Sequence, residues 1–213
     1  MPILKRKPIR VFLGLLVVII AVQVLNIALV QRRPDVEPRR LSDPGVLADR
    51  HAPVLGPSDA DVTIYLFSDY ACPNCHILHR DLRTLLATDR KVRIVYRDWP
   101  ILGEPSRNAA RQAIASVEQS RHGAFDDELM RRGGRLDESL LRAAAIRAGI
   151  DWPRLQREVA GNRPEIDRLL AETESYAGGL GFSGTPTVVI GPYIVEGRVS
   201  LDRMRELVRR ARM

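Results

Sequence analysis

Cys72 and Cys75, separated by two residues, are the only cysteines in this sequence of 213 residues. A CxxC pair serves three kinds of chemistry: dithiol–disulfide exchange, metal binding and covalent attachment of haem. The spacing alone does not separate these uses. The elements on either side of the pair therefore decide which chemistry to expect.

The pair falls where a strand pattern gives way to a helical one. Residues 62–68 are β-branched and aromatic, and apolar residues recur at helical spacing over 77–86, after Pro73. This junction places Cys72 at a helix N-terminus, where unpaired N–H groups and the helix dipole stabilise a thiolate, and Cys75 one turn further in. We expect Cys72 to be accessible and reactive and Cys75 to be sheltered, which suits disulfide exchange.

Haem and metal binding are alternative uses of the pair. Cys72 to His76 also spells the CxxCH pattern of c-type haem attachment, although a strand leading into the motif is not typical of such a site. Cys72, Cys75, His76 and His79 offer four metal-ligand side chains. On one helix, however, His76 points about 100° away from the face that Cys75 and His79 share. We therefore expect both histidines to be polar positions on the helix.

A third alternative is a non-enzymatic, membrane-tethered binding protein in which the pair is a structural disulfide. A loop of two residues closes little chain entropy, so such a disulfide stabilises a fold only weakly. This makes the pair a poor structural link and favours a redox role.

The elements that follow predict an α/β domain. Residues 92–96 alternate as a second strand and complete a strand–helix–strand unit around the pair. A long helical stretch comes next, with Asp137 and Asp151 where N-caps are needed and glycines where helices end. Residues 187–190 and 193–195 predict a closing hairpin before a last amphipathic helix. The helices expected in the long stretch cover 106–119, 124–132, 137–148, 151–160 and 165–177.

The net charge of +7 and the pI near 10.0 raise the question of a nucleic-acid ligand. Residues 1–40 hold eight Lys or Arg against two acidic residues, whereas residues 41–213 hold 25 against 24. A nucleic-acid-binding domain needs a basic face on its folded body. This distribution argues against nucleic acid as a partner.

An apolar segment of membrane-spanning length lies within the basic end. Residues 11–30 are interrupted only by Gly14, Gln23 and Asn26, and about 20 apolar residues cross a bilayer as a helix. No convincing small-x-small cleavage site follows. We expect an uncleaved transmembrane signal anchor, preceded by a short basic tail over 1–10.

The basic residues on the two sides of this anchor are equal in number, but those in the short N-terminal tail are more closely packed. This favours a cytoplasmic N-terminus and a catalytic domain on the extracytoplasmic, periplasmic side. On that side a dithiol oxidant is not kept reduced by cytosolic thiols. Residues 31–57 are rich in Pro and charge and are expected to form a tether. The folded domain is expected over 58–211.

The order of these motifs resembles the DsbA-like thiol:disulfide oxidoreductases of the thioredoxin superfamily. The resemblance covers about residues 56–211 and rests on Phe-Ser-Asp-Tyr-Ala-Cys72-Pro-Asn-Cys75-His, a long helical segment, and Gly-Thr185-Pro186-Thr-Val-Val-Ile-Gly. The crossover into the closing hairpin far exceeds the dozen or so residues that one helix needs. The resemblance implies an α/β, thioredoxin-like fold with an inserted helical subdomain over about 100–183, preceded here by one N-terminal transmembrane helix.

The resemblance also implies that the Thr185–Pro186 bond is cis and lies beside Cys72, although most X–Pro bonds are trans. The backbone at Thr185 would then pair with an extended substrate as an added strand and hold the substrate cysteine over Cys72. Pro186 has no N–H and cannot join that ladder. Thr185 and Pro186 are the expected substrate-binding residues.

Cys72 and Cys75 are the expected catalytic residues, and this chemistry requires no metal or organic cofactor. Pro73 and Asn74 between them tune the stability of the thiolate and hence the redox potential. The strong oxidant of the family has Pro-His at these positions, so the direction of electron flow stays open. The expected partners are cysteine-containing protein substrates and a redox partner that regenerates the pair.

Overall fold

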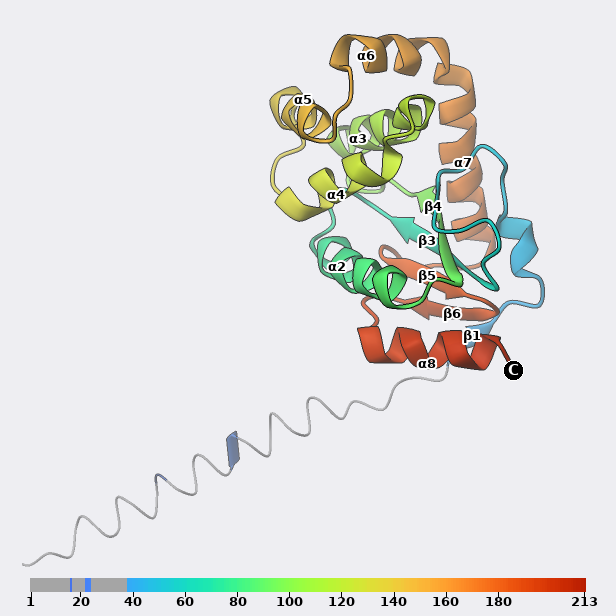
Figure 1. The fold of residues 1–213 in the computed structure, drawn as a ribbon. Helices are drawn as coiled ribbons and strands as arrows, with labels where there is room; N and C mark the ends of the chain where they lie inside the picture. The colour runs from blue at the N-terminus through green and yellow to red at the C-terminus, as the bar shows by residue number, and fades with distance from the viewer. Residues whose placement is uncertain (1–15, 17–21, 24–37) are drawn as a thin grey trace, which may run out of the picture. The chain divides into compact units, whose positions relative to one another are not determined.

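A mixed sheet carries the fold. The computed structural model describes residue 16, residues 22–23 and residues 38–213 (Figure 1). Within residues 38–213, six strands pair in the order β1-β6-β5-β3-β4-β2, and the central β3–β4 pair is parallel while the other pairs are antiparallel. The strands are β1 (Arg39–Arg40), β2 (Val54–Leu55), β3 (Val62–Ser68), β4 (Val92–Asp98), β5 (Thr187–Ile190) and β6 (Tyr193–Glu196).

Strands β3 and β4 form the buried centre of the sheet. Their register runs from Val62 opposite Val92 to Ser68 opposite Asp98. Nearly every residue of both strands is buried because both faces of the sheet are covered, and the buried side chains are mainly apolar, with Ser68, Arg97 and Asp98 as polar exceptions at the carboxyl ends. Helix α2 (Pro73–Thr88) connects them, and the carboxyl ends of both strands therefore lie at the edge where the cysteine pair begins α2.

The helical insertion that the resemblance implies lies between β4 and β5. Its helices begin and end within two residues of the expected ranges. Asp137 and Asp151 are N-caps, as expected, because their side chains accept hydrogen bonds at 3.0 Å from the N–H groups of Leu140 and Arg154. The helices are α3 (Glu104–Ala115), η2 (Ser116–Gln119), α4 (His122–Arg132), α5 (Glu138–Arg147), α6 (Trp152–Gly161) and α7 (Arg163–Gly179), and α8 (Leu201–Ala211) follows the hairpin.

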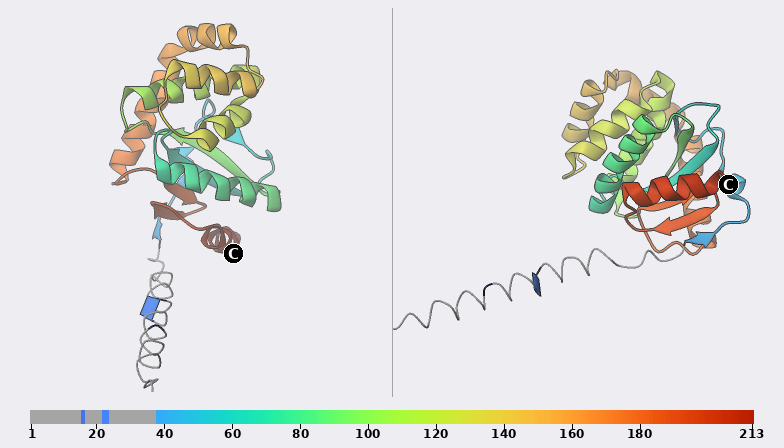
Figure 2. Two further views of the ribbon diagram at one scale, coloured as in Figure 1. Left: turned by 90° about the vertical axis from the view of Figure 1, so that its left-hand side faces the viewer. Right: turned by 60° about the horizontal axis from the view of Figure 1, so that its bottom comes forward.

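Three apolar clusters hold the layers together. One lies within the insertion and includes both Cys72 and Cys75. The second packs α2 and α8 against one face of the sheet, around Leu78 and Leu207 (Figure 2). The third covers the other face with the end of α7 and the N-terminal segment through Leu47. The cysteines are therefore covered by the insertion.

The expectation that residues 31–57 form a tether is wrong from Pro38 onward. Strand β1 pairs with β6 at one edge of the sheet, and β2 pairs with β4 at the other. Leu47, in the short helix η1 (Pro44–Leu47), is fully buried. Strands of two residues are too short to show an alternating pattern, so the proline and charge content of the segment concealed them. The folded domain begins near Pro38 and not at residue 58.

The tail expected over 1–10 lies outside the described residues, as does the anchor expected over 11–30 apart from residues 16 and 22–23. Among the residues that the structure describes, no helix is both long enough and apolar enough to cross a bilayer. The anchor stays a prediction from the sequence.

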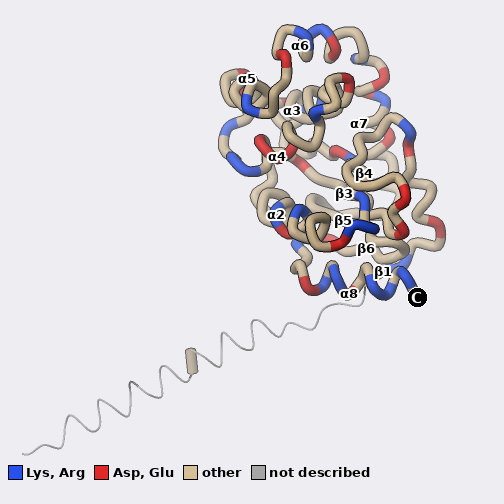
Figure 3. The backbone as a smooth tube through the Cα atoms, viewed as in Figure 1, with Lys and Arg blue, Asp and Glu red and all other residues tan. Residues whose placement is uncertain are grey.

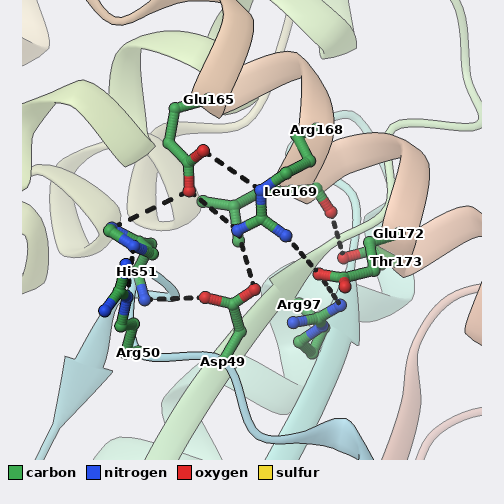
Figure 4. A network of polar contacts seen from close by, with 9 residues as sticks. All are labelled: Asp49, Arg50, His51, Arg97, Glu165, Arg168, Leu169, Glu172 and Thr173. Carbon is green, nitrogen blue, oxygen red and sulfur yellow. Dashed lines mark hydrogen bonds and ion pairs between the residues drawn. The ribbon is translucent and has the colours of Figure 1, made fainter.

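Lys and Arg alternate with Asp and Glu along the outer helices (Figure 3), and one network of them joins the segment before β2 to α7 (Figure 4). The Asp49 carboxylate accepts hydrogen bonds from the His51 N–H at 2.7 Å and from the Arg168 guanidinium at 2.9 Å. Arg168 also donates to Glu165 and Glu172 on α7. Burial raises the pKa of Asp49, but these hydrogen bonds and the Arg168 charge outweigh it and lower that pKa to about 2.

We predict that this network makes stability fall in acid. The folded state lowers the pKa of Asp49 below its ordinary value of 3.8, so its contribution is complete above that value and is lost as the pH falls through about 2. With allowance for solvent screening, the contribution is about 1 kcal/mol. Arg168→Ala should lower the free energy of unfolding in urea by about this amount near neutral pH and by much less at about pH 2.

Arg205→Ala on α8 is the matched control. Arg205 pairs with Asp202, whose side chain is 94% exposed, so we expect no measurable change in the free energy of unfolding. Equal losses for the two variants, or a loss for Arg168→Ala that does not depend on pH, would contradict this role for the network.

Candidate active site

The cysteine pair lies at the N-terminus of α2, as expected. Cys72 is the N-cap residue, with extended backbone angles of −81° and 117°, and Pro73 and Asn74 are exposed in the first turn. The Cys75 N–H donates to the Cys72 carbonyl at 3.0 Å. None of the described residues of this turn is acidic. The positive end of the helix dipole therefore acts on Cys72 without a competing carboxylate in that turn.

Both thiols are free, and they differ less in exposure than the sequence predicts. Cys72 is 6% exposed and Cys75 is 2% exposed. The expectation of an openly accessible Cys72 is wrong, because the helical insertion packs around it and the Thr185 carbonyl lies against its sulfur. Burial raises the pKa of Cys75, and the neighbouring Cys72 acts in the same direction. Cys75 is thus the sheltered, protonated thiol.

The Thr185–Pro186 peptide bond is cis and lies against the pair, as the resemblance implied. The Cys72 thiol donates to the Thr185 carbonyl at 3.3 Å, although 113 positions separate the two residues in the sequence. Pro186 is buried, and its carbonyl accepts a hydrogen bond at 2.7 Å from the Gly197 N–H. The loop before β5 is therefore fixed beside the reactive end of α2.

His76 is held by the backbone of two other segments. Its ring nitrogens Nδ1 and Nε2 lie 2.7 Å from the Met130 carbonyl oxygen and 2.8 Å from the Tyr70 carbonyl oxygen. Both nitrogens are therefore occupied, and neither is free to bind a haem iron or a metal ion shared with the cysteines. This geometry does not fit the CxxCH alternative.

His79 belongs to a separate polar group. Its Nδ1 lies 3.3 Å from Asp126 and its Nε2 lies 2.9 Å from Asp127, which also pairs with Arg83. Among the described residues, His79, Asp126 and Asp127 are the one group whose ligating atoms are close enough to hold a metal ion, and this group excludes both cysteines. Because Arg83 pairs with Asp127, the group fits a polar network better than a metal site. His79 therefore does not join Cys75 as a ligand of one metal site, as the metal-binding alternative requires.

Asp69 organises the loop before Cys72 and was missed as a structural residue. It is 1% exposed, and its carboxylate accepts hydrogen bonds from the Ala71 N–H at 2.8 Å and the Leu102 N–H at 2.9 Å, as well as from the Ser106 hydroxyl. A charged residue in a loop is more often exposed, so its burial was not expected from its type alone. An Asp whose side chain binds the N–H two residues later is a recognised turn signal and was available in the sequence.

A layer of buried polar residues adjoins the pair through Tyr70. Burial raises the pKa of Asp98 and of Asp126, and the Tyr96 hydroxyl donates to Asp126 at 3.0 Å. Burial, followed by the effect of these two carboxylates, raises the pKa of Tyr70. His122 packs on Tyr96, and burial lowers its pKa to about 3. Burial thus favours the uncharged forms of these groups.

The match to a known family agrees with this geometry. Residues 49–210 match the family described as Thioredoxin. A thioredoxin-like oxidoreductase from Silicibacter pomeroyi DSS-3 is 38% identical, with a TM-score of 0.75 over 80% of this chain and 98% of that one. The thiol-disulfide exchange protein alpha-DsbA2 from Wolbachia pipientis is 25% identical, with a TM-score of 0.74 over 78% and 90% of the two chains.

The curated relatives are longer proteins. Na(+)/H(+) antiporter NhaA 1 of Salinispora arenicola is 28% identical over 157 residues, which make up 73% of this chain and 24% of the antiporter. This chain therefore spans about a quarter of the length of the curated relatives it matches. Because the family match covers well over half of its residues, the chain belongs to the thioredoxin family, and it shares its fold with an oxidoreductase and a thiol-disulfide exchange protein.

Proposed function

We propose that this protein is a thiol:disulfide oxidoreductase that exchanges disulfides with cysteine-containing protein substrates through Cys72 and Cys75. One observation carries the proposal: two free thiols lie at a helix N-terminus, one of them more deeply buried, and the Thr185 carbonyl is 3.3 Å from the Cys72 sulfur. The family match and the similarity to a thioredoxin-like oxidoreductase support it.

In the oxidising direction, a substrate thiolate attacks the Cys72 sulfur of a Cys72–Cys75 disulfide. A bond forms between the substrate sulfur and Cys72, and the Cys72–Cys75 bond breaks with its electron pair passing to Cys75. Because burial raises the pKa of Cys75, this leaving thiolate takes up a proton. A second substrate thiolate then attacks the substrate sulfur, which releases an oxidised substrate and leaves Cys72 as a thiolate. Two electrons have moved from the substrate to the pair.

The same atoms serve reduction and isomerisation. The Cys72 thiolate attacks a substrate disulfide, and Cys75 must lose its proton before it can resolve the mixed disulfide. Pro73 and Asn74, which separate the two cysteines in the sequence and are exposed, are proposed to tune the stability of the thiolate. A difference of 30 mV corresponds to about 1.4 kcal/mol, so a single hydrogen bond to the thiolate is enough to shift the redox potential by about this amount.

Thr185 and Pro186 are proposed to hold the substrate. An extended segment adds to the Thr185 backbone as a strand, and the substrate sulfur takes a position over Cys72. Cys72 is only 6% exposed. Its sulfur is therefore reached only by substrate segments whose backbone can pair with the Thr185 loop.

We also propose that residues 11–30 anchor the domain in a membrane, with the N-terminus in the cytoplasm and the domain on the periplasmic side. The apolar length and the basic flanks of the segment support this. The full chain should stay with membranes after alkaline extraction, and its recovery in the supernatant would contradict the anchor.

We predict that Cys75→Ala traps substrates. Without Cys75, a mixed disulfide on Cys72 has no internal thiol to resolve it, so adducts of higher mass should accumulate on non-reducing gels and disappear with dithiothreitol. Cys72→Ala is the matched control and should trap at least tenfold less, because Cys75 is 2% exposed and protonated. Equal trapping by the two variants would contradict the assignment of Cys72 as the attacking thiol.

We also predict an unusual pH dependence for Cys75. In Cys72→Ala, alkylation of Cys75 by iodoacetamide should rise about tenfold per pH unit, without a plateau up to about pH 10, because burial raises the pKa of this thiol and only the thiolate reacts. The measurement is the second-order rate followed by mass spectrometry. A plateau near the ordinary thiol pKa of 9.0 would show that Cys75 is not desolvated in solution.

A further inference from the structure

A pocket of about 460 Å³ opens beside Cys72, between the start of α2 and the end of α4. Ala71 and Pro73, the two chain neighbours of Cys72, both line it. A substrate that reaches the Cys72 sulfur therefore brings its own neighbouring side chains to this α2–α4 pocket. We propose that the pocket is a subsite for an Asp or Glu next to the reacting cysteine of the substrate. This inference rests on the disulfide exchange proposed above.

The pocket has an apolar lining and fixed walls. Ile77 and Met130 contribute the apolar surface. The His76 ring bridges the Met130 carbonyl, at 2.7 Å, and the Tyr70 carbonyl, at 2.8 Å. The end of α4 cannot move away from the loop before Cys72 without losing these contacts, so His76 is a positioning residue. A site formed before the substrate arrives lowers the ordering cost of binding.

Three arginines give the pocket its charge. Arg80 comes from α2, and Arg131 and Arg132 come from the end of α4, where their side chains are 62% and 44% exposed. Figure 3 shows blue stretches at this end of α4 and in the loop after it. Within the described part of the chain, no Asp or Glu lines the pocket. Glu128, which pairs with Arg131 and Arg132, is shared with Arg147, so the pocket keeps a net positive charge.

A carboxylate side chain fits this combination of groups. Guanidinium groups bind carboxylates through two parallel hydrogen bonds, and the aliphatic stem of a Glu packs on a surface such as that of Ile77 and Met130. Charge complementarity of this kind raises the association rate and weakens as salt is added. We therefore expect acidic neighbours to speed the capture of a substrate cysteine.

Two single-cysteine peptides, one with Glu and one with Lys on both sides of the cysteine, test the subsite. In the full-length Cys75→Ala variant, Cys72 is capped as a mixed disulfide with neutral thiopyridine, and each peptide thiol displaces thiopyridone, which absorbance records. Each rate is divided by the rate of the same peptide with dithiodipyridine, which removes differences in intrinsic thiol reactivity. The corrected rate should be about tenfold higher for the acidic peptide at low salt and at most about threefold higher at about 0.5 M NaCl.

Variants identify the residues responsible. Arg80→Glu combined with Arg132→Glu should bring the ratio of corrected rates to about one or below. If this double variant does not fold, Arg80→Gln with Arg132→Gln should lower the ratio in the same direction. Arg142→Glu with Arg157→Glu carries the same charge change on exposed positions of α5 and α6, outside the pocket, and should leave the ratio unchanged.

Equal corrected rates at low salt would overturn the subsite, as would loss of the ratio in the Arg142 and Arg157 control. If the oxidised wild-type chain exchanges its disulfide with neither peptide, and the reduced chain cleaves the disulfide-linked dimer of neither peptide, the proposed oxidoreductase activity itself is contradicted. The two failures are therefore distinguishable.

Discussion

The buried carboxylate of Asp69 is the interaction on which the site depends. It accepts hydrogen bonds from three segments: the loop before Cys72, the loop after β4 through Leu102, and the first turn of α3 through Ser106. A carboxylate taken out of water costs several kcal/mol unless donors replace its hydration, and these three donors do so. The position of Cys72 at the helix N-terminus is thereby linked to the sheet edge and to the helical insertion at once.

Burial, to which the insertion contributes, creates the chemical difference between the two sulfurs. The apolar cluster that contains both cysteines is built mostly from insertion residues, and it covers Cys75 more fully than Cys72. Desolvation by burial keeps Cys75 protonated, while the helix dipole acts on Cys72. The order of attack and resolution in the proposed exchange follows from this difference.

Much of the architecture was predictable because its signals are local. The apolar run of β3, the helical spacing after Pro73 and the caps at Asp137 and Asp151 each occupy a few consecutive residues. Strands β1 and β2 were not predictable, since two residues carry no periodicity and gain their structure from the strands beside them.

The candidate active site was also predictable only where its signals are local. The placement of the cysteine pair at the start of α2 follows from a local pattern, whereas the contact of Cys72 with Thr185 required the family resemblance. The burial of Cys72, Asp69 and Asp98 was missed because it is imposed by helices that lie far away in the sequence. Only the turn formed by Asp69 left a signal that the sequence itself could have supplied.

The 113 positions between Cys72 and Thr185 have a consequence for biosynthesis. Both cysteines leave the ribosome well before the loop that contains Thr185 has been translated. At that stage the nascent chain carries two thiols that this loop does not yet cover. With only two cysteines in the sequence, this exposure cannot lead to internal mispairing, because a single intramolecular disulfide is available. The hazard that remains is exchange with foreign disulfides, in which the foreign disulfide breaks as a mixed disulfide forms, and the Thr185 loop limits it at Cys72 once β5 pairs with β3.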